Sequence, residues 1–421
     1  MRPQIRLLIA IPALNEENSI EGIIKRTLDA RRFIIENSPV THVEVTVISD
    51  GSTDRTVELA RRYADRIRLI IFERNQGYGA AIKEAWKSTN AELLGFLDAD
   101  GTCDPRFFAN LCNALSRENA DLVLGCRLNR RAHMPAIRRA GNYLFAWLLT
   151  LLSKQRVRDT ASGMRVIRRE AYQKLLPLPS GLHFTPAMSA RAMLGAGGEL
   201  KLLEIDMPYY EREGRSKLRV FHDGLRFLRI IFETAFLYHP ARLFGFAGVG
   251  SLMVAVALMA TPVAHYWSAR NVEGWMLYRF ILGHLTATIA FLMFSAALLT
   301  RRVVQIAISG RSSYARADWI DRLILSRIYW AAPLLLILGG ALLVGPNLVA
   351  RATSHQAYEH WSRFITMSFF FLLAAILIST RVLFYFLDLV AEQLDYLRSH
   401  NRNANSSEAS DPSVLANRAA V

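Results

Sequence analysis

The sequence predicts an α/β domain built on a mostly parallel sheet, followed by an α-helical membrane domain. Two observations support this prediction. In the first half of the 421-residue chain, short β-type runs alternate with helical patterns, which is typical of βαβ units on a parallel sheet. After about residue 240, four apolar stretches each exceed the roughly 20 residues with which a helix crosses a bilayer.

The expected strands are five apolar runs, each separated from the next by a helical pattern. They lie at 5–12, 43–49, 67–72, 92–100 and 121–127. In parallel sheets, ligands bind beyond the carboxyl ends of the strands. The motifs PALNEE, SDGSTD, RNQGYGAA and DADG follow the first four strands in turn. We therefore predict a ligand site at this edge of the sheet.

The motif LDADG places Asp98 and Asp100 two residues apart where an apolar run ends. Carboxylate oxygens at this spacing suit Mg²⁺ or Mn²⁺, which keeps several water ligands and binds a diphosphate. An Asp-rich turn that holds no metal is the alternative for such an isolated pair.

Gly77 and Gly79 lie at the start of the helical pattern that follows the third strand. Free N–H groups at a helix N-terminus favour phosphate, although glycines there also simply tighten a strand-to-helix turn. The segment matches neither the GxGxxG fingerprint nor a P-loop, which disfavours dinucleotide binding and ATP hydrolysis.

Two later segments carry cations beside glycine. RDTASGMR brings Asp159 and Arg165 around a Ser-Gly turn, and YEREGRSKL offers Arg212, Arg215 and Lys217. Such cations bind phosphates bidentately or as point charges. A solvated basic loop near the membrane is the alternative interpretation.

The motifs PALNEE, SDGSTD, DADG, GCR, DTASGMR and REGRSKL, in this order, resemble the family-2 glycosyltransferases of the GT-A fold. The similar branch contains dolichyl-phosphate mannose synthase and bacterial polyprenyl-phosphate glycosyltransferases. The resemblance covers about residues 5–220. It implies a Rossmann-like, mostly parallel sheet with flanking helices. It also implies inverting transfer of a hexose-type sugar from a UDP- or GDP-linked donor to a polyprenyl phosphate, for cell-envelope glycan or glycoconjugate modification.

The resemblance also implies roles for single residues. Asp50 bonds the donor base, Asp98 and Asp100 hold the metal, and Asp159 and Arg165 lie in the reaction-centre loop. The nucleotide pocket is walled by Pro12, Leu14, Asn15 and Glu16, to which we add the helix-start glycines Gly77 and Gly79. Phosphates of the acceptor and the donor are received by Arg127, which we also count as catalytic, and by Arg138, Arg212 and Lys217.

Two positions depart from the pattern of this branch. Close relatives carry Gln as an additional metal ligand where this chain has Thr102, which affects the expected metal geometry. Many relatives have an acidic residue in the helix after the reaction loop, where this chain reads HFTPAMSARA, residues 183–192. The second departure affects the surface that recognises the donor sugar.

Arginines predict the orientation in the membrane. The connection between the second and third apolar stretches holds six of them, whereas each of the other two connections holds two. The positive-inside rule places the arginine-rich connection in the cytoplasm, and four spans place residues 1–240 and the tail there too. We therefore expect an integral protein of the cell inner membrane with a cytoplasmic catalytic domain. Arg381, inside the fourth stretch, is expected to snorkel.

We predict a transferase domain at 1–218, an amphipathic interface helix at 219–242, a membrane domain at 243–391 and a disordered cytoplasmic tail at 392–421. In the segment 219–244, an apolar face and a basic face suit a helix lying in the membrane interface, and a core-packed helix is the alternative. Residues 143–152 are apolar nearly all round but too short to span, so they form an interfacial or a buried helix. The apolar face of 219–244 holds Phe221, Leu225, Leu228, Phe232 and Ala235, and the basic face Arg219, Arg226 and Arg229.

The formal net charge is +15, but the basic residues cluster beside apolar segments. We therefore expect a nucleotide sugar, a polyprenyl phosphate and the membrane as partners, and no nucleic acid. Self-association into a homo-oligomer is left open.

A phosphate monoester, with a second pKa of about 6, is already mostly ionised at pH 7, so the expected acceptor needs no general base. Asp159 is accordingly expected to orient groups rather than to act as an obligatory base. One alternative is a processive polysaccharide synthase, which the absence of a Q-x-x-R-W segment disfavours. The other is a non-catalytic membrane scaffold with a degenerate transferase domain, which the intact motif residues disfavour.

Overall fold

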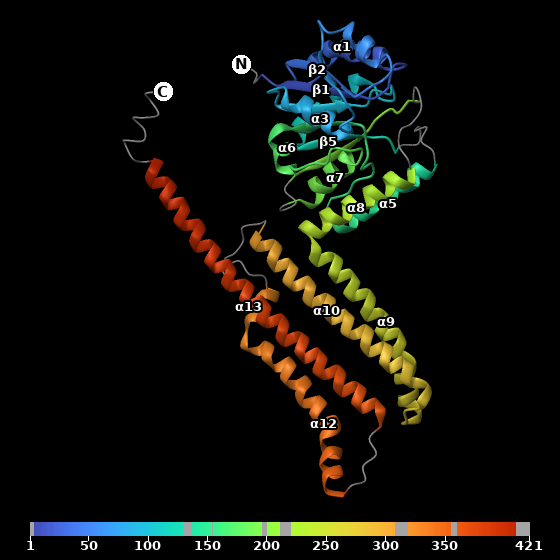
Figure 1. The fold of residues 1–421 in the computed structure, drawn as a ribbon, viewed down its shortest axis with the longest axis vertical. Coiled ribbons are helices and arrows are strands. Elements are labelled where there is room, and N and C mark those ends of the chain that lie inside the picture. The colour runs from blue at the N-terminus through green and yellow to red at the C-terminus, as the bar shows by residue number, and fades with distance from the viewer. Residues whose placement is uncertain are drawn as a thin grey trace. The chain divides into compact units, whose positions relative to one another are not determined.

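The structure is a computed structural model that describes residues 4–128, 136–153, 155–195, 200–210, 220–307, 319–354 and 360–409 (Figure 1). Its contacts divide the chain into two compact units, Met1–Tyr238 and His239–Val421.

The first unit is built on a seven-stranded sheet with the strand order β3-β2-β1-β4-β6-β5-β7. β6 runs antiparallel to its neighbours β4 and β5, whereas the other neighbouring pairs are parallel. The predicted α/β class with a mostly parallel sheet is therefore confirmed. The strands are β1 (Arg6–Ala13), β2 (His42–Asp50), β3 (Arg68–Phe72), β4 (Leu93–Leu97), β5 (Leu122–Cys126), β6 (Met164–Arg168) and β7 (Leu202–Asp206).

The five predicted runs correspond to β1–β5, and the sequence interpretation missed β6 and β7. Both missed strands are five residues long, and charged residues interrupt their apolar pattern. Helices flank the sheet (Figure 1). They are α1 (Ile20–Asn37), α2 (Thr56–Arg61), α3 (Tyr78–Lys87), α4 (Phe108–Arg117), α5 (Ala136–Leu152), α6 (Arg169–Leu175), α7 (Phe184–Leu194) and α8 (Val220–Tyr238), with the short 3₁₀ helix η1 (Pro105–Phe107) before α4.

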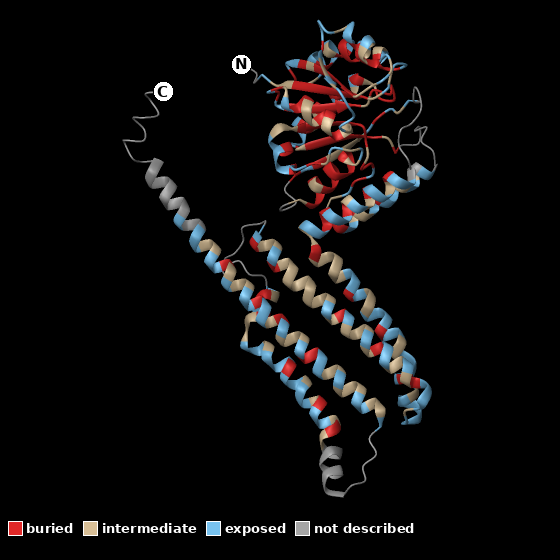
Figure 2. Ribbon diagram, viewed as in Figure 1, coloured by how far each residue is buried: buried red, intermediate tan, exposed pale blue. Residues whose placement is uncertain are grey.

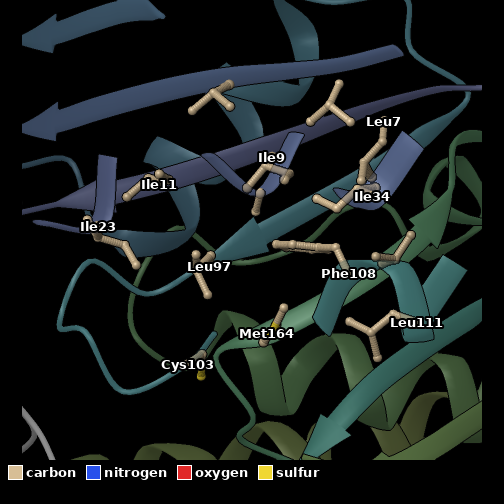
Figure 3. Close-up of a cluster of buried hydrophobic side chains, with 14 of the residues drawn as sticks. Leu7, Ile9, Ile11, Ile23, Ile34, Leu97, Cys103, Phe108, Leu111 and Met164 are labelled. Carbon is tan, nitrogen blue, oxygen red and sulfur yellow. The ribbon is translucent and has the colours of Figure 1, made fainter. Parts of the chain in front are cut away.

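The core of this unit lies between the sheet and the helices α1 and α4. Leu7, Ile9 and Ile11 alternate along β1 and meet Ile23 of α1 and Phe108 at the start of α4, all fully buried (Figure 3). Burying such a side chain contributes about 1.5 to 3 kcal/mol. Most residues of β1, β2, β4, β5 and β6 are buried, as is nearly all of α7, whereas β3 has no buried residue (Figure 2). These strands carry the loops that follow their carboxyl ends.

α8 packs against α5 and α7. One of its faces is buried, and another is apolar and exposed. Phe227 and Ile231 are buried, and the Phe227 ring meets the Phe145 ring of α5 with 5.9 Å between the centroids. A second face is apolar and exposed, with Phe221 at 81% exposure, and α5 exposes apolar residues such as Trp147 as well. For both helices, the interfacial and the packed interpretation therefore hold in part. Each helix packs on the domain with one face and leaves another apolar face exposed.

The second unit contains four helices that are long and apolar enough to cross a membrane, at Pro240–Ala269, Gly274–Ala307, Arg327–Gly345 and Trp361–Leu397. The four predicted stretches are thus confirmed as helices. α9 packs along α10, and α13 packs along both α10 and α12. The elements are α9 (Pro240–Ala269), η2 (Gly274–Met276), α10 (Leu277–Ala307), α11 (Trp319–Leu325), η4 (Arg327–Trp330), α12 (Ala331–Ser354) and α13 (Trp361–Ala409).

Arg381 of α13 is bound by protein groups, and the expectation that it snorkels stays a prediction. Its guanidinium donates to the carbonyl oxygens of residues 324–326 at the end of α11, including that of Ser326 at 2.7 Å. It also lies over the rings of Tyr329 and Trp330. The last carbonyls of a helix have no partner inside the helix, and a cation there is favourable.

The end of α13 differs from the predicted disordered tail. The helix continues to Ala409, well past residue 392, and residues 410–421 lie outside the described part of the chain. Between Leu397 and Ala409 the sequence contains no proline or glycine that would end a helix.

Candidate active site

A cavity of about 1020 Å³ lies at the carboxyl ends of the strands in the first unit. Residues at the ends of β1, β2, β4 and β5 form its polar wall, and residues of α5 and α8 form an apolar wall. The motifs predicted to gather at this edge are thus brought together. The predicted site residues that line the cavity are Pro12, Leu14, Glu16, Asp50, Gly77, Asp98, Asp100 and Arg127.

The remaining predicted residues are placed differently. Asn15, Gly79, Asp159 and Arg165 are not part of the cavity lining. Arg212 and Lys217 lie outside the described residues, as does the side chain of Arg138, whose backbone belongs to α5.

Asn15 joins the loop after β1 to the loop after β2. Its backbone has a φ of 49°, a left-handed conformation that asparagine tolerates better than most residues. The N–H of Thr53 donates to its Oδ1 at 2.8 Å, and its own N–H donates to Ser52 Oγ at 3.1 Å. Asn15 therefore supports the wall that its neighbours Leu14 and Glu16 line.

Asp50 is both a turn residue and a cavity residue. Its carboxylate accepts the N–H groups of Gln76 at 2.7 Å and Gly77 at 3.0 Å. Burial raises the pKa of Asp50 above its ordinary value, and these two hydrogen bonds only partly oppose that effect. A carboxylate has about four lone-pair sites, so the group accepts further donors while it faces the cavity.

Two N–H groups at the start of α3 already have partners within the protein, and nucleotide binding by Gly77 and Gly79 stays a prediction. The N–H of Gly77 is used by Asp50, and the N–H of Ala80 donates to the carbonyl of Ser180 at 3.0 Å. A Cβ on Gly79 would lie 2.4 Å from the carbonyl oxygen of Pro179. The glycines are required because the segment 179–181 runs directly over the helix start.

Asp98 is held from two sides. The hydroxyl of Tyr78 donates to its Oδ1 at 2.5 Å, and a Cβ on Gly163 would lie 1.8 Å from its Oδ2. Burial and then the Asp98 carboxylate raise the pKa of Tyr78 well above its ordinary value, so the hydroxyl remains a donor. Only glycine at position 163 leaves room for this carboxylate.

Asp100 is oriented by Thr102, the residue that departs from the related pattern. Its Oδ1 accepts the hydroxyl of Thr102 at 2.7 Å and the backbone N–H at 3.2 Å. Burial raises the pKa of the neighbouring Cys103 to about 12, and Cys103 does not line the cavity.

The two carboxylates suit a cation that takes its other ligands from a substrate. Within the described residues, no group of three or more His, Cys, Asp and Glu side chains gathers as a metal site. Mg²⁺ is typically bound through one or two carboxylates together with water and substrate phosphates. Asp98 and Asp100, oriented on one side of an open cavity, match this donor set.

Arg127 and Asp159 form a buried ion pair beside the cavity. Arg127 Nε donates to Asp159 Oδ2 at 2.7 Å, and Nη2 donates to Oδ1 at 2.9 Å and to the carbonyl of Ala161 at 2.7 Å. The guanidinium also lies over the ring of Tyr209. Burial alone raises the pKa of Asp159, but Arg127 outweighs it and the pKa lies below its ordinary value. Asp159 is therefore an ionised partner of Arg127 and orients it.

Arg165 is fully buried and positions the loop that precedes it. Its guanidinium donates to the carbonyls of Ser162 at 3.0 Å and Thr160 at 2.7 Å, and to Ser189 Oγ of α7 at 2.8 Å. Burial lowers its pKa to about 10, so it is still charged at neutral pH. Its predicted catalytic role is corrected to a positioning role, because it does not reach the cavity.

Sequence reasoning missed Tyr78, Gly163 and Tyr209, although all three line the cavity. Tyr78 stands between Gly77 and Gly79, and Gly163 lies within DTASGMR. Both residues therefore lie within motifs that were selected for other residues, namely their glycines and charged side chains. Tyr209 had no local signal, because the strand β7 before it was not predicted.

Comparisons with known proteins give matches to glycosyltransferases. The family described as Glycosyl transferase family 2 matches residues 8–176. The dolichyl-phosphate hexose transferase of Haloferax volcanii is 31% identical over 227 residues, which are 52% of this chain and 89% of that protein. The low-salt glycan biosynthesis hexosyltransferase Agl6 of the same organism is 30% identical over 64% of this chain, and the match spans 61% of its own length.

Among solved structures, glucosyl-3-phosphoglycerate synthase from Mycobacterium tuberculosis, in complex with Mn²⁺, UDP and phosphoglyceric acid, is similar. The TM-score is 0.43 with 21% identity, over 55% of this chain and 78% of that one.

We expect Gly79→Ala to lower the free energy of unfolding by about 1 to 3 kcal/mol, because an added methyl group overpacks the contact with Pro179. The matched control is Gly22→Ala in α1, where no atom lies within 4 Å of the added Cβ. That change should stabilise the helix by about 0.5 to 1 kcal/mol. Thermal unfolding of the full-length protein in detergent compares the two variants, and equal melting temperatures would contradict the close approach.

We expect Arg127→Met to lower the free energy of unfolding by about 3 to 5 kcal/mol, because it leaves the buried Asp159 carboxylate without its cation. In the wild type the lowered pKa of Asp159 means that stability is lost as pH falls through it. In the variant, burial raises this pKa above the unfolded value, so acid protonates the carboxyl and restores stability. The loss should therefore be smaller at pH 5 than at pH 8.

The double variant Arg127→Met/Asp159→Asn is the control for this experiment. It removes both charges, so the difference from the wild type should no longer shrink between pH 8 and pH 5. A loss in Arg127→Met that is the same at both pH values would show that the ion pair does not govern the stability of this site.

Proposed function

Because this chain belongs to glycosyl transferase family 2, we propose that it moves a hexose from a nucleoside-diphosphate sugar to a polyprenyl phosphate, with inversion at the anomeric carbon. The observation that carries the proposal is the cavity whose polar wall holds Asp50, Asp98 and Asp100 and whose other wall is apolar. One wall suits a charged nucleotide donor and the other an isoprenoid acceptor. The related dolichyl-phosphate hexose transferase supports this pairing.

The donor nucleotide is proposed to bind at the ends of β1 and β2. Pro12, Leu14 and Glu16 line the cavity there, next to Asp50. The carboxylate of Asp50 is fixed by two backbone N–H groups, so it presents its remaining lone pairs in one direction. Such a fixed acceptor suits an N–H group of a nucleobase, and a base bound there leaves the diphosphate toward β4.

The metal that this family implies fits the two oriented aspartates. Asp98 and Asp100 are proposed to hold Mg²⁺ or Mn²⁺, which when bound neutralises charge on the donor diphosphate. Tyr78 and Thr102 each fix one oxygen of these carboxylates and so orient them toward the cavity that both aspartates line. Protein groups positioned in advance need no reorganisation when the substrate arrives.

Arg127 is proposed to receive a phosphate at the centre of the cavity. Its Nε and Nη2 atoms are used by Asp159 and Ala161, whereas no hydrogen bond from Nη1 to another described residue is found. Arg127 faces the cavity, and guanidinium groups bind phosphate through charge-assisted hydrogen bonds. Asp159 sets the direction of this donor and removes no proton from the acceptor. The ionised acceptor phosphate is itself the nucleophile, so the reaction needs no base.

The membrane helices are proposed to bring this site to its lipid substrate. A polyprenyl phosphate is confined to the bilayer, and the second unit has four helices able to cross it. The exposed apolar faces of α5 and α8 suit the membrane interface. The arginine-rich connection between the second and third spans supports a cytoplasmic active site in the inner membrane. Arg138, Arg212 and Lys217 remain proposed phosphate contacts, and the product is proposed to serve cell-envelope glycans or glycoconjugates.

We expect the wild-type protein, given a radiolabelled UDP- or GDP-hexose, undecaprenyl phosphate and Mn²⁺, to form a lipid-linked sugar. Asp100→Ala should lower kcat/KM by more than a hundredfold, because changes outside the ligand shell alone already lower metal affinity or activity roughly 10- to 100-fold. It should also weaken Mn²⁺ binding in the presence of UDP or GDP, measured by calorimetry.

Asp104→Ala is the control, because Asp104 accepts the N–H of Arg106 at 2.9 Å and does not line the cavity. Its product formation and Mn²⁺ binding should match those of the wild type. Full activity in Asp100→Ala would remove the metal assignment, and lack of product with every donor in a panel of nucleotide sugars would remove the proposed reaction.

A further inference from the structure

Two arginines of α8 are one turn apart but have different surroundings. Arg226 lines the cavity, whereas Arg229 does not. Both side chains are largely exposed, at 57% and 79%. Arg229 forms an ion pair within the helix with Glu233 at 2.7 Å. Arg226 and Arg229 therefore differ in their position relative to the cavity, whereas both are charged and largely exposed.

Arg226 stands at the boundary between two faces of α8. Phe227 and Ile231 mark the buried face, and the exposed apolar face begins with Phe221 and continues through Leu225. Asp223, on the buried side, lies 3.7 Å from the Arg226 guanidinium. Arg226 lines the cavity, and much of its surface stays exposed.

The charges in the cavity lining are divided unevenly between its walls. The anionic residues lie at the strand ends, and among the described lining residues the cations are Arg127 and Arg226. Arg127 follows β5, on the side of the strand ends, and is shared with Asp159. Arg226 is thus the cation that the apolar wall contributes, and on α8 it is flanked along the chain by the lining residues Leu225, Phe227 and Leu228.

We infer that Arg226 binds the phosphate of the isoprenoid acceptor at the point where its charged head joins its apolar chain. This inference rests on the proposed function, because it names a further residue for the acceptor of that reaction. A phosphate monoester on an isoprenoid combines a dianion with an apolar tail, and Arg226 combines a guanidinium with apolar neighbours on the same wall. Guanidinium groups bind phosphate bidentately and stay charged at all relevant pH values.

The same chemistry exists in the head groups of bilayer phospholipids, and the pair of arginines separates the two sources. A general attraction of α8 to an anionic surface depends on both charges, so Arg226→Gln and Arg229→Gln would act alike. Binding of the acceptor phosphate inside the cavity depends on Arg226 alone. Assays in neutral detergent, without anionic phospholipid, remove the surface contribution.

The test measures initial rates of the full-length protein against undecaprenyl phosphate concentration at saturating donor, and then against donor concentration. Arg226→Gln should raise the KM for undecaprenyl phosphate about tenfold to a hundredfold, as expected for losing hydrogen bonds between charged groups. Its KM for the donor should stay within about twofold of the wild-type value. Arg229→Gln should leave both KM values unchanged, and Arg226→Lys should recover part of the affinity for the acceptor.

Equal acceptor KM values in Arg226→Gln and Arg229→Gln would overturn the inference, and so would a rise in the donor KM alone. Thermal unfolding of each variant is measured alongside. If Arg226→Gln does not fold, Arg226→Lys decides the outcome, because it keeps the charge and loses the bidentate fork. If the KM of Arg226→Lys for undecaprenyl phosphate is higher than that of Arg229→Lys, the inference is supported. If the two KM values are equal, it is overturned. Absence of lipid product in the wild type would instead remove the proposed function itself.

Discussion

The site depends on one short loop, residues 159–163, being held in place by two buried arginines. Arg127 binds its first residue and the carbonyl of Ala161, and Arg165 binds two more of its carbonyls from the opposite side. The loop ends at Gly163, whose Cα leaves just enough room for the Asp98 carboxylate. Tyr78 then fixes that carboxylate from α3. Each contact depends on the one before it, so the position of Asp98 is set by cavity-lining groups together with Arg165 and Asp159, which are fully buried and do not line the cavity.

Arg127 and Arg165 both bring a positive charge to the loop 159–163, and the two charges have different hydrogen-bond partners. Arg127 has a full carboxylate partner in Asp159, whereas the described hydrogen bonds of Arg165 go to carbonyl and hydroxyl oxygens alone. Its pKa is lowered to about 10, which still leaves it charged. Arg165 therefore brings a positive charge to the reaction loop with no carboxylate among its described hydrogen-bond partners.

Local sequence pattern was sufficient for the five strands β1–β5, for the gathering of motifs at their carboxyl ends and for the four apolar spans. It was insufficient where a residue's role depends on a distant partner. Gly77 and Gly79 have the pattern of a phosphate loop, but a segment about a hundred residues later covers them. Arg165 has the pattern of a phosphate-binding cation, but Ser189 of α7 and two carbonyls enclose it. The partners of Arg381 could not be predicted either, because its acceptors lie 55 to 57 residues earlier in the chain.

The partners of Arg381 have a consequence for how the membrane unit is assembled. An arginine within an apolar span opposes insertion by about 2.5 to 3.5 kcal/mol on translocon scales. The carbonyls at the end of α11 offset this opposition, and α11 precedes α13 in the chain, so it has been synthesised by the time the last span leaves the ribosome. The partners of this arginine are therefore already present in the chain when the last span is made, so the hydrogen bonds that offset its charge can form as α13 docks on α11.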